Sequence, residues 1–568
     1  MSARLRAGHD PPRRSAITAG QVREAGDSAL LLQLDARIDP AINARAIAIA
    51  DAVRSLGIRG LRDVVATYRS VAVYFDPLVV ETEAVRETLE RATAAAEGSN
   101  ERHDPDRRPV ELPIAYGGQF GPDLDELAAY ARLTTAEVIQ RHTSATYRVF
   151  MLGFLPGFPY MGVVPPEIAM PRKTTPRVRV TRGSVGIAGM QTGIYPTDAP
   201  GGWQIIGRTP VELFDVERVP PARLRPGDRV RFVAIPELPS DTEADPAAVS
   251  SHVPSSAARE RSITLVRPGL FTTVQDVGRW GYQSEGVPVS GAMDSVAHRT
   301  ANALVGNHRS AATLEVTLVG PEIRVEHAAT IALAGADLSA TVDGKPVPVN
   351  QPTRCNAGSL VRFGERRVGI RTYVAFDGGI EAPLLLGSRS MHVRSALGGI
   401  GGRPLAASEE LLLGAARTRP DIQRTRAPID TTPSGAARVR VLPGPQDDMF
   451  PPEALDVLQQ TRFRLASQSD RMGYRLLGGR LPRRDGPEMI SDATFGGAIQ
   501  VPTSGEPILL MADRQTTGGY PQIATVITAD LPHVAQLGPG DSIEFRVCTR
   551  AEALQELAEQ ERRLRAFD

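Results

Sequence analysis

The densest group of polar side chains in this 568-residue sequence follows the apolar run Ile508–Ala512. Asp513, Arg514, Gln515 and Thr517 bring a carboxylate, a guanidinium, an amide and a hydroxyl together, and two glycines behind them let main-chain N–H groups approach a ligand. This set suits a small carboxylate or amide, because arginine binds an oxyanion, glutamine matches an amide edge and aspartate accepts a proton. The alternative is a polar turn that caps a buried strand.

Further candidate residues lie in three other segments. The loop 153–162 packs aromatic residues between Gly and Pro, which is typical of a pocket lining or of a plugged barrel end. Only two of the 65 basic residues (Lys and Arg) are lysines. One of them, Lys173, follows Arg172 in a basic segment, which either binds an anion or is simply solvated. Further candidates for binding or catalysis are Tyr160, Lys173, Gln191, Tyr195, Gln275, Asp276, Tyr520 and His142. A buried histidine is, however, more often structural than catalytic.

Several familiar chemistries are excluded by the motifs. Gly344-Lys345 is followed by Pro346, so there is no P-loop, and neither H-E-x-x-H nor G-x-S-x-G occurs. The two cysteines, Cys355 and Cys548, do not form a C-x-x-C pair. We therefore expect neither a disulfide framework nor a protein-bound metal.

Charge and hydropathy exclude two classes of partner. Lys and Arg together number 65, as do Asp and Glu, so the formal net charge is zero. A protein that binds nucleic acid or an acidic membrane through bulk charge needs a basic excess. No stretch of 18 apolar residues and no signal peptide is visible, so we expect a cytoplasmic protein.

The elements that would position these residues change in character along the chain. The first hundred residues predict strand, helix, strand, strand and helix over 28–34, 39–56, 64–75 and 80–97, and a last strand at Val110–Ile114 completes the ferredoxin-like order. After it, apart from a helix near 123–142, short apolar runs alternate with Gly and Pro, which indicates β-sandwiches or barrels.

Two phrases occur twice in the same order. Gly183–Pro196 and Gly505–Pro521 both combine a glycine, an apolar strand, Gln-Thr and Tyr-Pro. Pro226-Gly227-Asp228 and Pro539-Gly540-Asp541 follow them, each before a strand-like run. We interpret this as one barrel fold used twice; a common turn before a strand is the alternative.

These changes predict a domain order. We expect a disordered tail at 1–21, an α/β cap at 22–108, a barrel at 109–235, a Pro/Ser/Asp-rich linker at 236–262, barrels at 263–420 and 421–548, and a helix at 549–568.

The longer motifs resemble two related protein families. GFLPGFPYMG, GSVGIAGMQTGIYP and GGWQIIGRTP resemble the KipI family, also called allophanate hydrolase subunit 1 or the B subunit of 5-oxoprolinase. PGLFTTVQDVGRWGYQ, GVPVSGAMD, SDRMGYRL and LMADRQTTGGYPQIA resemble KipA, which is the matching subunit 2 or C subunit, with Trp280 where that family has proline. The chain thus resembles a fusion of both.

The resemblance implies a mainly β fold of cyclophilin-like barrels with an α/β cap on the KipI half. It implies an ATP-dependent 5-oxoprolinase that acts with a separate A subunit, ATP and Mg on a small lactam or amide. It also implies two alternatives: a biotin-dependent carboxyltransferase, as in urea carboxylase, and a non-catalytic inhibitor of a sensor histidine kinase. Neither lysine, Lys173 nor Lys345, has the methionine flanks of a biotin carrier, so biotin would come on another chain. The resemblance leaves open whether several copies of the chain form a homo-oligomer.

From these features we expect one active site between the two halves. The rims 191–195 and 513–520 would face a shared cleft, with Lys173 and Arg514 as anchors for an anion.

Overall fold

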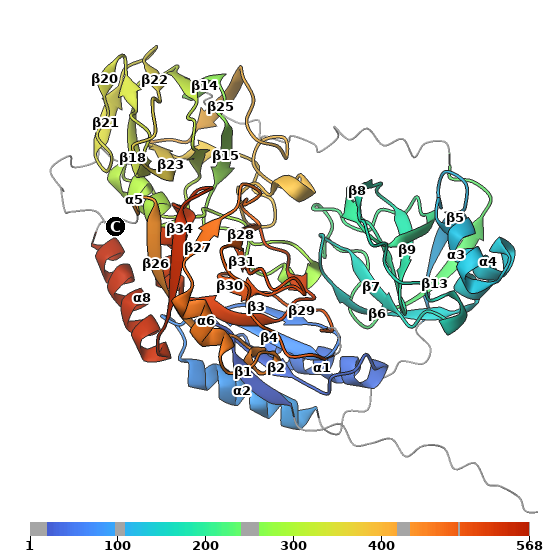
Figure 1. The fold of residues 1–568 in the computed structure, drawn as a ribbon. Coiled ribbons are helices and arrows are strands. Elements are labelled where there is room, and N and C mark those ends of the chain that lie inside the picture. The colour runs from blue at the N-terminus through green and yellow to red at the C-terminus, as the bar shows by residue number, and fades with distance from the viewer. Residues whose placement is uncertain (1–19, 97–107, 240–260, 417–431, 487–488, 567–568) are drawn as a thin grey trace, which may run out of the picture.

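A computed structural model describes residues 20–96, 108–239, 261–416, 432–486 and 489–566 (Figure 1). Of the predicted tail, only its last two residues fall within these ranges, and Gln21 already begins a strand. The predicted linker lies largely outside them. The chain forms a small α/β cap, two closed barrels and a two-sheet unit, which confirms the predicted mainly β architecture.

The cap is an antiparallel sheet of order β1-β2-β4-β3 with two helices on one face. Asp39 caps the first helix by accepting from the Ala41 and Ile42 N–H groups. Its elements are β1 (Gln21–Glu24), β2 (Ala29–Gln33), α1 (Pro40–Ser55), β3 (Leu61–Ala66), β4 (Ser70–Phe75) and α2 (Thr82–Ala95).

One expected strand belongs elsewhere. Val110–Ile114 does not complete the cap: it lies in β5, which pairs with two strands of the first barrel. The outer place beside β2, where the ferredoxin-like order needs a last strand, is taken by β1 from the start of the chain. The prediction of a cap with this last strand was therefore wrong, because a hairpin partner nearer in sequence fills that edge.

The open face of the cap sheet packs on the second half of the chain. Leu31, Ala72 and Tyr74 form one buried cluster with Phe495 of the second barrel, and the Tyr74 hydroxyl donates to the Thr494 carbonyl at 2.8 Å. Figure 1 shows the blue cap directly beneath the orange barrel, while the cyan barrel stands to one side. The cap therefore joins the two halves and does not cover the first barrel alone.

The two barrels share one topology. The first closes as β5-β13-β6-β7-β10-β9-β12 and the second as β26-β34-β27-β28-β31-β30-β33, with one parallel pair in each, β5 with β13 and β26 with β34. The strands of the first barrel are β5 (Val110–Tyr116), β6 (Thr146–Leu152), β7 (Pro159–Gly162), β9 (Ser184–Ala188), β10 (Gln191–Ile194), β12 (Gln204–Arg208) and β13 (Arg229–Ile235). Those of the second are β26 (Ala436–Pro443), β27 (Phe463–Leu465), β28 (Gly473–Leu477), β30 (Ala498–Gln500), β31 (Ile508–Leu510), β33 (Gln522–Val526) and β34 (Ser542–Val547).

This shared order confirms the duplication but not every repeated phrase. The Pro-Gly-Asp turns precede equivalent strands, β13 and β34. The Gln-Thr phrases do not correspond, because Gln191 begins β10, whereas Gln515 lies in a loop after β31. The expectation that 191–195 and 513–520 are sibling rims was wrong for this reason.

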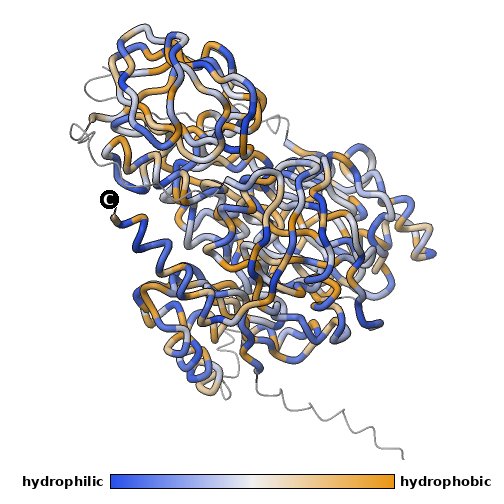
Figure 2. Tube along the Cα trace, turned by 60° about the vertical axis from the view of Figure 1, so that its left-hand side comes forward, coloured by the Kyte–Doolittle hydropathy of each residue, from blue (hydrophilic) through white to orange (hydrophobic). Residues whose placement is uncertain are grey.

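Short elements complete the barrels. These are α3 (Leu124–Ala131), α4 (Thr135–Ser144) and the pair β8 (Arg177–Val180) with β11 (Ala199–Gly201) in the first, and α6 (Ala454–Gln460), α7 (Leu531–Ala535) and the pair β29 (Asp492–Ala493) with β32 (Thr517–Gly518) in the second. The predicted C-terminal helix is α8 (Arg550–Arg565). In Figure 2 this helix, which ends at the C label, is mostly hydrophilic.

The unit at 261–416, predicted as a barrel, is instead two sheets around one core. One sheet runs β20 (Lys345–Pro346), β19 (Thr341–Val342), β22 (Leu360–Arg362), β17 (Glu322–Val325), β14 (Ser262–Arg267), β25 (Glu409–Leu413) and β24 (Ile380–Glu381). The other runs β15 (Phe271–Gln275), β16 (Thr313–Thr317), β23 (Val368–Phe376), β18 (Ala329–Asp337) and β21 (Pro352–Cys355), and α5 (Ser295–Leu304) packs on it.

Candidate functional site

The aromatic loop of the first barrel meets the polar segment of the second. A Cβ atom at Gly153 would overlap the Thr517 hydroxyl, so the loop and β32 are in van der Waals contact. Behind this contact, Glu285, in the short helix η3 (Gln283–Glu285), accepts from the Gly157 N–H with its carbonyl and from the Ala222 N–H with its carboxylate, both at 2.8 Å. The two halves of the chain therefore meet at the loop 153–158.

The cap contributes a tyrosine to this junction. The Tyr68 ring lies 5.1 Å from Phe150 and 6.3 Å from Tyr160, centroid to centroid. Its hydroxyl is fully buried and has no hydrogen-bond partner in the described part of the chain. Burial raises its pKa well above the ordinary value, and the Arg172 cation acts in the opposite direction. A buried hydroxyl without a partner is costly, so this one is free for a ligand.

Two further hydroxyls face the same place. Burial raises the pKa of Tyr160 to about 12, while Arg172 and the Thr517 hydroxyl lower it. Thr517 Oγ1 is itself buried without a well-formed hydrogen bond among the residues described. Tyr68, Tyr160 and Thr517 thus come from the cap, the first barrel and the second barrel, and each can donate to a polar ligand.

Arg514 is a buried guanidinium without a carboxylate partner in the described structure. Its Nη2 donates to Gln283 Oε1 at 3.4 Å, and Nε has no partner. Gly496 leaves room beside it, because a Cβ there would lie 3.4 Å from Nη1. Burial lowers the pKa of Arg514 below its ordinary value. Because a buried charge is stable only when it is paired, Arg514 is suited to bind an anion.

Asp513, the neighbouring candidate, is already engaged. Arg471 donates to both of its carboxylate oxygens at 2.9 Å. The same guanidinium bonds Glu315 and the Gly291 carbonyl, and the Tyr373 hydroxyl donates to Glu315 at 2.7 Å. Asp513 is thus part of a buried ion network that fixes the start of the 513–520 segment.

The other residues of that segment lie nearer its surface. The Gln515 carbonyl accepts from the Thr494 hydroxyl, and its side chain is half-buried. The Tyr520 ring is 45% exposed, while its carbonyl accepts from Gln500 at 3.4 Å.

The predicted anion anchor Lys173 is paired within its own barrel. Its ammonium lies 3.0 Å from Asp123 and 2.9 Å from Glu126, and these carboxylates raise its pKa. It is therefore not a free cation, and the expectation that it anchors a substrate anion loses its physical basis. Arg172, one residue earlier, forms no hydrogen bond or ion pair in the described ranges and acts on the buried tyrosines instead.

Three other candidates belong to the first barrel, and of these Tyr195 lies in the aromatic cluster of the junction. His142 is buried, with Tyr116 at 2.7 Å from Nδ1 and Thr192 at 3.1 Å from Nε2, and burial lowers its pKa to about 3. It is a neutral structural histidine. Gln191 is half-buried at the start of β10. Tyr195 packs edge-on against Phe158, and burial raises its pKa to about 12.

Gln275 and Asp276 hold a loop of the two-sheet unit. Asp276 accepts from the Gly278 and Arg389 N–H groups and from the hydroxyls of Ser388 and Ser390. Gln275 donates to the Met391 carbonyl at 3.1 Å. Asp276 thus organises the loop at 388–391 and does not face the junction with a free oxygen.

Tyr68 and Gln283 are not among the residues expected from the sequence. Tyr68 lies in a strand-to-strand turn of the cap, and nothing in its local sequence distinguishes it. Gln283 ends the motif GRWGYQ, but its role depends on contacts with distant segments. Its N–H donates to Asp63 of the cap at 2.7 Å, so it joins the cap to Arg514.

Over the described residues, no group of three or more His, Cys, Asp or Glu side chains is placed to hold a metal ion. No helix in those ranges is long and apolar enough to cross a membrane.

Comparison with known proteins assigns both halves. Residues 20–224 match the family model for the carboxyltransferase domain, subdomains C and D, and residues 285–547 match the one for its subdomains A and B. The chain is 38% identical over 301 residues to the C subunit of 5-oxoprolinase from Escherichia coli (53% of this chain, 96% of that protein). It is 40% identical over 227 residues to the B subunit of 5-oxoprolinase from Bacillus subtilis (38% of this chain, 93% of that protein).

The chain is also similar to part of a longer protein and to a solved structure that spans both halves. Urea amidolyase of Lachancea kluyveri is 34% identical over 307 residues, which span 50% of this chain and 16% of that protein. The crystal structure of TTHA0988 superposes with a TM-score of 0.79 at 35% identity and covers 93% of this chain and 100% of its own. That structure therefore matches both halves at once.

Proposed function

Because the chain belongs to the carboxyltransferase-domain family, we propose that it unites the B-type and C-type subunits of an ATP-dependent 5-oxoprolinase in one polypeptide. The support is coverage: the two halves match the B and C subunits of 5-oxoprolinase over nearly their whole lengths, whereas they match only 16% of a urea amidolyase. A separate A-type subunit would complete the enzyme, in the cytoplasm where ATP is available.

One structural observation carries the proposal: the buried cation of Arg514, without a carboxylate partner among the described residues, lies in the same interface as three buried hydroxyls, and that of Tyr68 has no hydrogen-bond partner there. 5-Oxoproline carries one carboxylate and one planar lactam. Arg514 would bind the carboxylate, and the hydroxyls of Tyr68, Tyr160 and Thr517 would hydrogen-bond the lactam oxygen.

These residues suit activation of an amide carbonyl. A lactam resists attack by water, and transfer of the γ-phosphoryl group from Mg·ATP to its oxygen would make the ring carbon electrophilic. One water would then add to this carbon and the C–N bond would break, leaving an acyl phosphate, and a second water would cleave this to glutamate and phosphate. The interface residues would orient the ring and stabilise the charge on its oxygen, and they exclude bulk water because they are buried.

A second function, transfer of a carboxyl group from biotin to urea or a related amide, is favoured by the family's carboxyltransferase models and by the urea amidolyase match. In this case Arg514 would bind the carboxylate of carboxybiotin, which would be supplied on another chain.

The two functions are separated by one experiment. The purified chain is mixed with the A-type subunit, Mg·ATP and 5-oxoproline, and glutamate and ADP are measured. We expect both only when all components are present. A matched reaction contains carboxybiotin and urea without ATP. Urea-dependent loss of carboxybiotin in that reaction, without glutamate in the first, would overturn the oxoprolinase proposal.

A further inference from the structure

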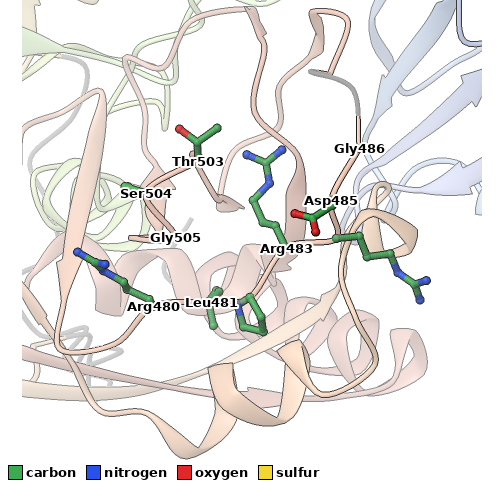
Figure 3. Close-up of a pocket in the computed structure, with 10 residues that line it drawn as sticks. Arg480, Leu481, Arg483, Asp485, Gly486, Thr503, Ser504 and Gly505 are labelled. Atoms are coloured by element: carbon green, nitrogen blue, oxygen red, sulfur yellow. The ribbon is translucent and has the colours of Figure 1, made fainter.

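A cleft of about 600 Å³ lies on the second barrel (Figure 3), and no residue of the aromatic loop 153–162 lines it. One wall is the segment after β28 and the other is the turn before β31. Its lining residues are Arg480, Leu481, Pro482, Arg483, Arg484, Asp485, Gly486, Thr503, Ser504 and Gly505.

Main-chain contacts hold the two walls in place. The Leu481 N–H donates to the Gly505 carbonyl at 2.9 Å, and the Leu481 side chain is buried. Arg484 ties the other end of the wall, with its N–H donating to the Met449 carbonyl at 3.0 Å and its Nε to the Phe450 carbonyl at 2.8 Å. The cleft is thus a fixed feature of the barrel.

The charge of the cleft is positive. Three arginines and one aspartate line it. Arg480 and Arg483 form no hydrogen bond or ion pair in the described ranges, so both guanidinium groups are unengaged. In Figure 3 Arg483 extends from its wall into the space between Thr503 and Asp485. The exposed hydroxyls of Thr503 and Ser504 form the opposite wall. Guanidinium groups beside hydroxyls are the donors that phosphate oxygens prefer.

One wall of the cleft lies a few residues before the candidate site in the sequence. Downstream of it, Ile490 packs on the aromatic cluster of Tyr68 and Tyr160, and Asp492 pairs with Gly518 in the β29–β32 ladder. Asp485 and Asp492 are seven residues apart, so at most about 25 Å of chain separates them. The segment that forms one wall of the cleft is thus close in sequence to the strand that pairs with Thr517.

We propose that this cleft binds the phosphate groups of a phosphate-bearing ligand, through Arg480 and Arg483 with the hydroxyls of Thr503 and Ser504. The identification of that ligand as the polyphosphate chain of ATP rests on the proposed function. The cleft would supply the nucleotide contact that no sequence motif provides.

Titration calorimetry on the full chain alone, with no other subunit present, tests the site. The probes are inorganic triphosphate, Mg·ATP and adenosine. We expect triphosphate and Mg·ATP to bind, adenosine alone not to bind, and added salt to weaken both. The double variant Arg480→Ala/Arg483→Ala should bind at least about tenfold more weakly, because two charge-assisted contacts are lost. Arg475→Ala, an exposed position on the same barrel, should bind as the unaltered chain does.

The outcomes separate the cleft from the proposed function. Equal binding by the double variant and Arg475→Ala, or no binding at all, overturns the cleft proposal even if the enzyme hydrolyses 5-oxoproline. Triphosphate binding that is lost in the double variant supports the site, even if 5-oxoproline is not a substrate. If triphosphate binds and Mg·ATP does not, the phosphate site stands, but its ligand is an inorganic phosphate compound and not a nucleotide.

Discussion

Two arginines in the interface, Arg471 and Arg514, are both buried but differ in what surrounds them. Arg471 bonds two carboxylates, Glu315 and Asp513, and burial alone would lower its pKa, whereas the two carboxylates raise it. Arg514 has only the Gln283 amide within hydrogen-bond distance among the described residues. The first is thus part of the folded framework, and the second is available for a substrate anion.

Substitution should separate these two roles. Arg514→Gln should lower kcat/KM by about 100-fold, the cost of one charge-assisted contact. Its melting temperature should change by no more than about 2 °C, because no ion pair is lost. Arg471→Met should destabilise the protein by about 3–5 kcal/mol, since two buried carboxylates lose their partner. Steady-state kinetics and thermal unfolding of both variants measure this; a large loss of stability in Arg514→Gln would make Arg514 structural.

Asp63 predicts a pH dependence of stability. Burial raises its pKa from 3.8 to about 6 in the folded protein. Between these values the folded state holds a proton that the unfolded state has lost, so stability falls as pH rises from about 4 to about 6. The full effect is about 3 kcal/mol. Asp63→Asn should remove this part of the dependence in melting curves recorded from pH 4.5 to 7. Parallel curves for the two proteins would contradict the assignment.

At this scale the sequence identifies residue types better than their roles. Arg514 stands out locally because it follows an apolar strand; it is buried in the interface, and its role as an anion site stays a prediction. Lys173 stands out as a rare lysine, but its ammonium is paired with Asp123 and Glu126, which are about 50 positions away. Tyr68 has no local signal, because its surroundings come from strands of the first barrel, about 80–90 positions later.

At the scale of elements, local pattern gives the strands and helices but not their sheets. The helices at α1 and α2 lie where the apolar spacing predicts them. Val110–Ile114 is a strand as expected, yet the pairing of the whole strand β5 with β12 and β13 depends on residues 90–120 positions later. The two Gln-Thr motifs do not occupy equivalent positions for the same reason: equivalence between the two barrels is defined by strand order and not by local sequence similarity.

The loop at Gly153 should be sensitive to a single methyl group. Gly153→Ala would place its Cβ against Thr517, so either β32 or the loop must shift. We expect a loss of activity of at least about tenfold, since small displacements in an active site are costly, with little change in the fold of each barrel. Gly202→Ala, in the same barrel, is the control because its Cβ would meet nothing closer than 3.5 Å. Unchanged kinetics in Gly153→Ala would show that the contact with Thr517 is not needed.

At the scale of the whole molecule, the cap makes one body of the two halves. Besides its apolar face, Asp27 accepts from the Thr528 N–H at 2.7 Å, and Arg550 of α8 donates to the Gly26 carbonyl at 2.9 Å. The Trp280 ring, at the position where the related family has proline, lies 5.0 Å from the Arg62 guanidinium of the cap. The association of the halves therefore rests on contacts between described residues that lie outside the predicted linker at 236–262.

Cutting the linker should leave the halves together. A protease site introduced within 245–255 and then cleaved should give two fragments that elute as one complex at micromolar concentration, because an interface with an apolar centre and buried hydrogen bonds is stable without a covalent link. The double variant Tyr74→Ala/Arg550→Ala removes the ring contact with Phe495 and the hydrogen bonds to the cap. Its two fragments should therefore dissociate at a higher protein concentration than the unaltered fragments do. Tyr130→Ala, an exposed position on α3, is the matched control. If the unaltered fragments elute separately, covalent linkage, and not the cap, holds the site together.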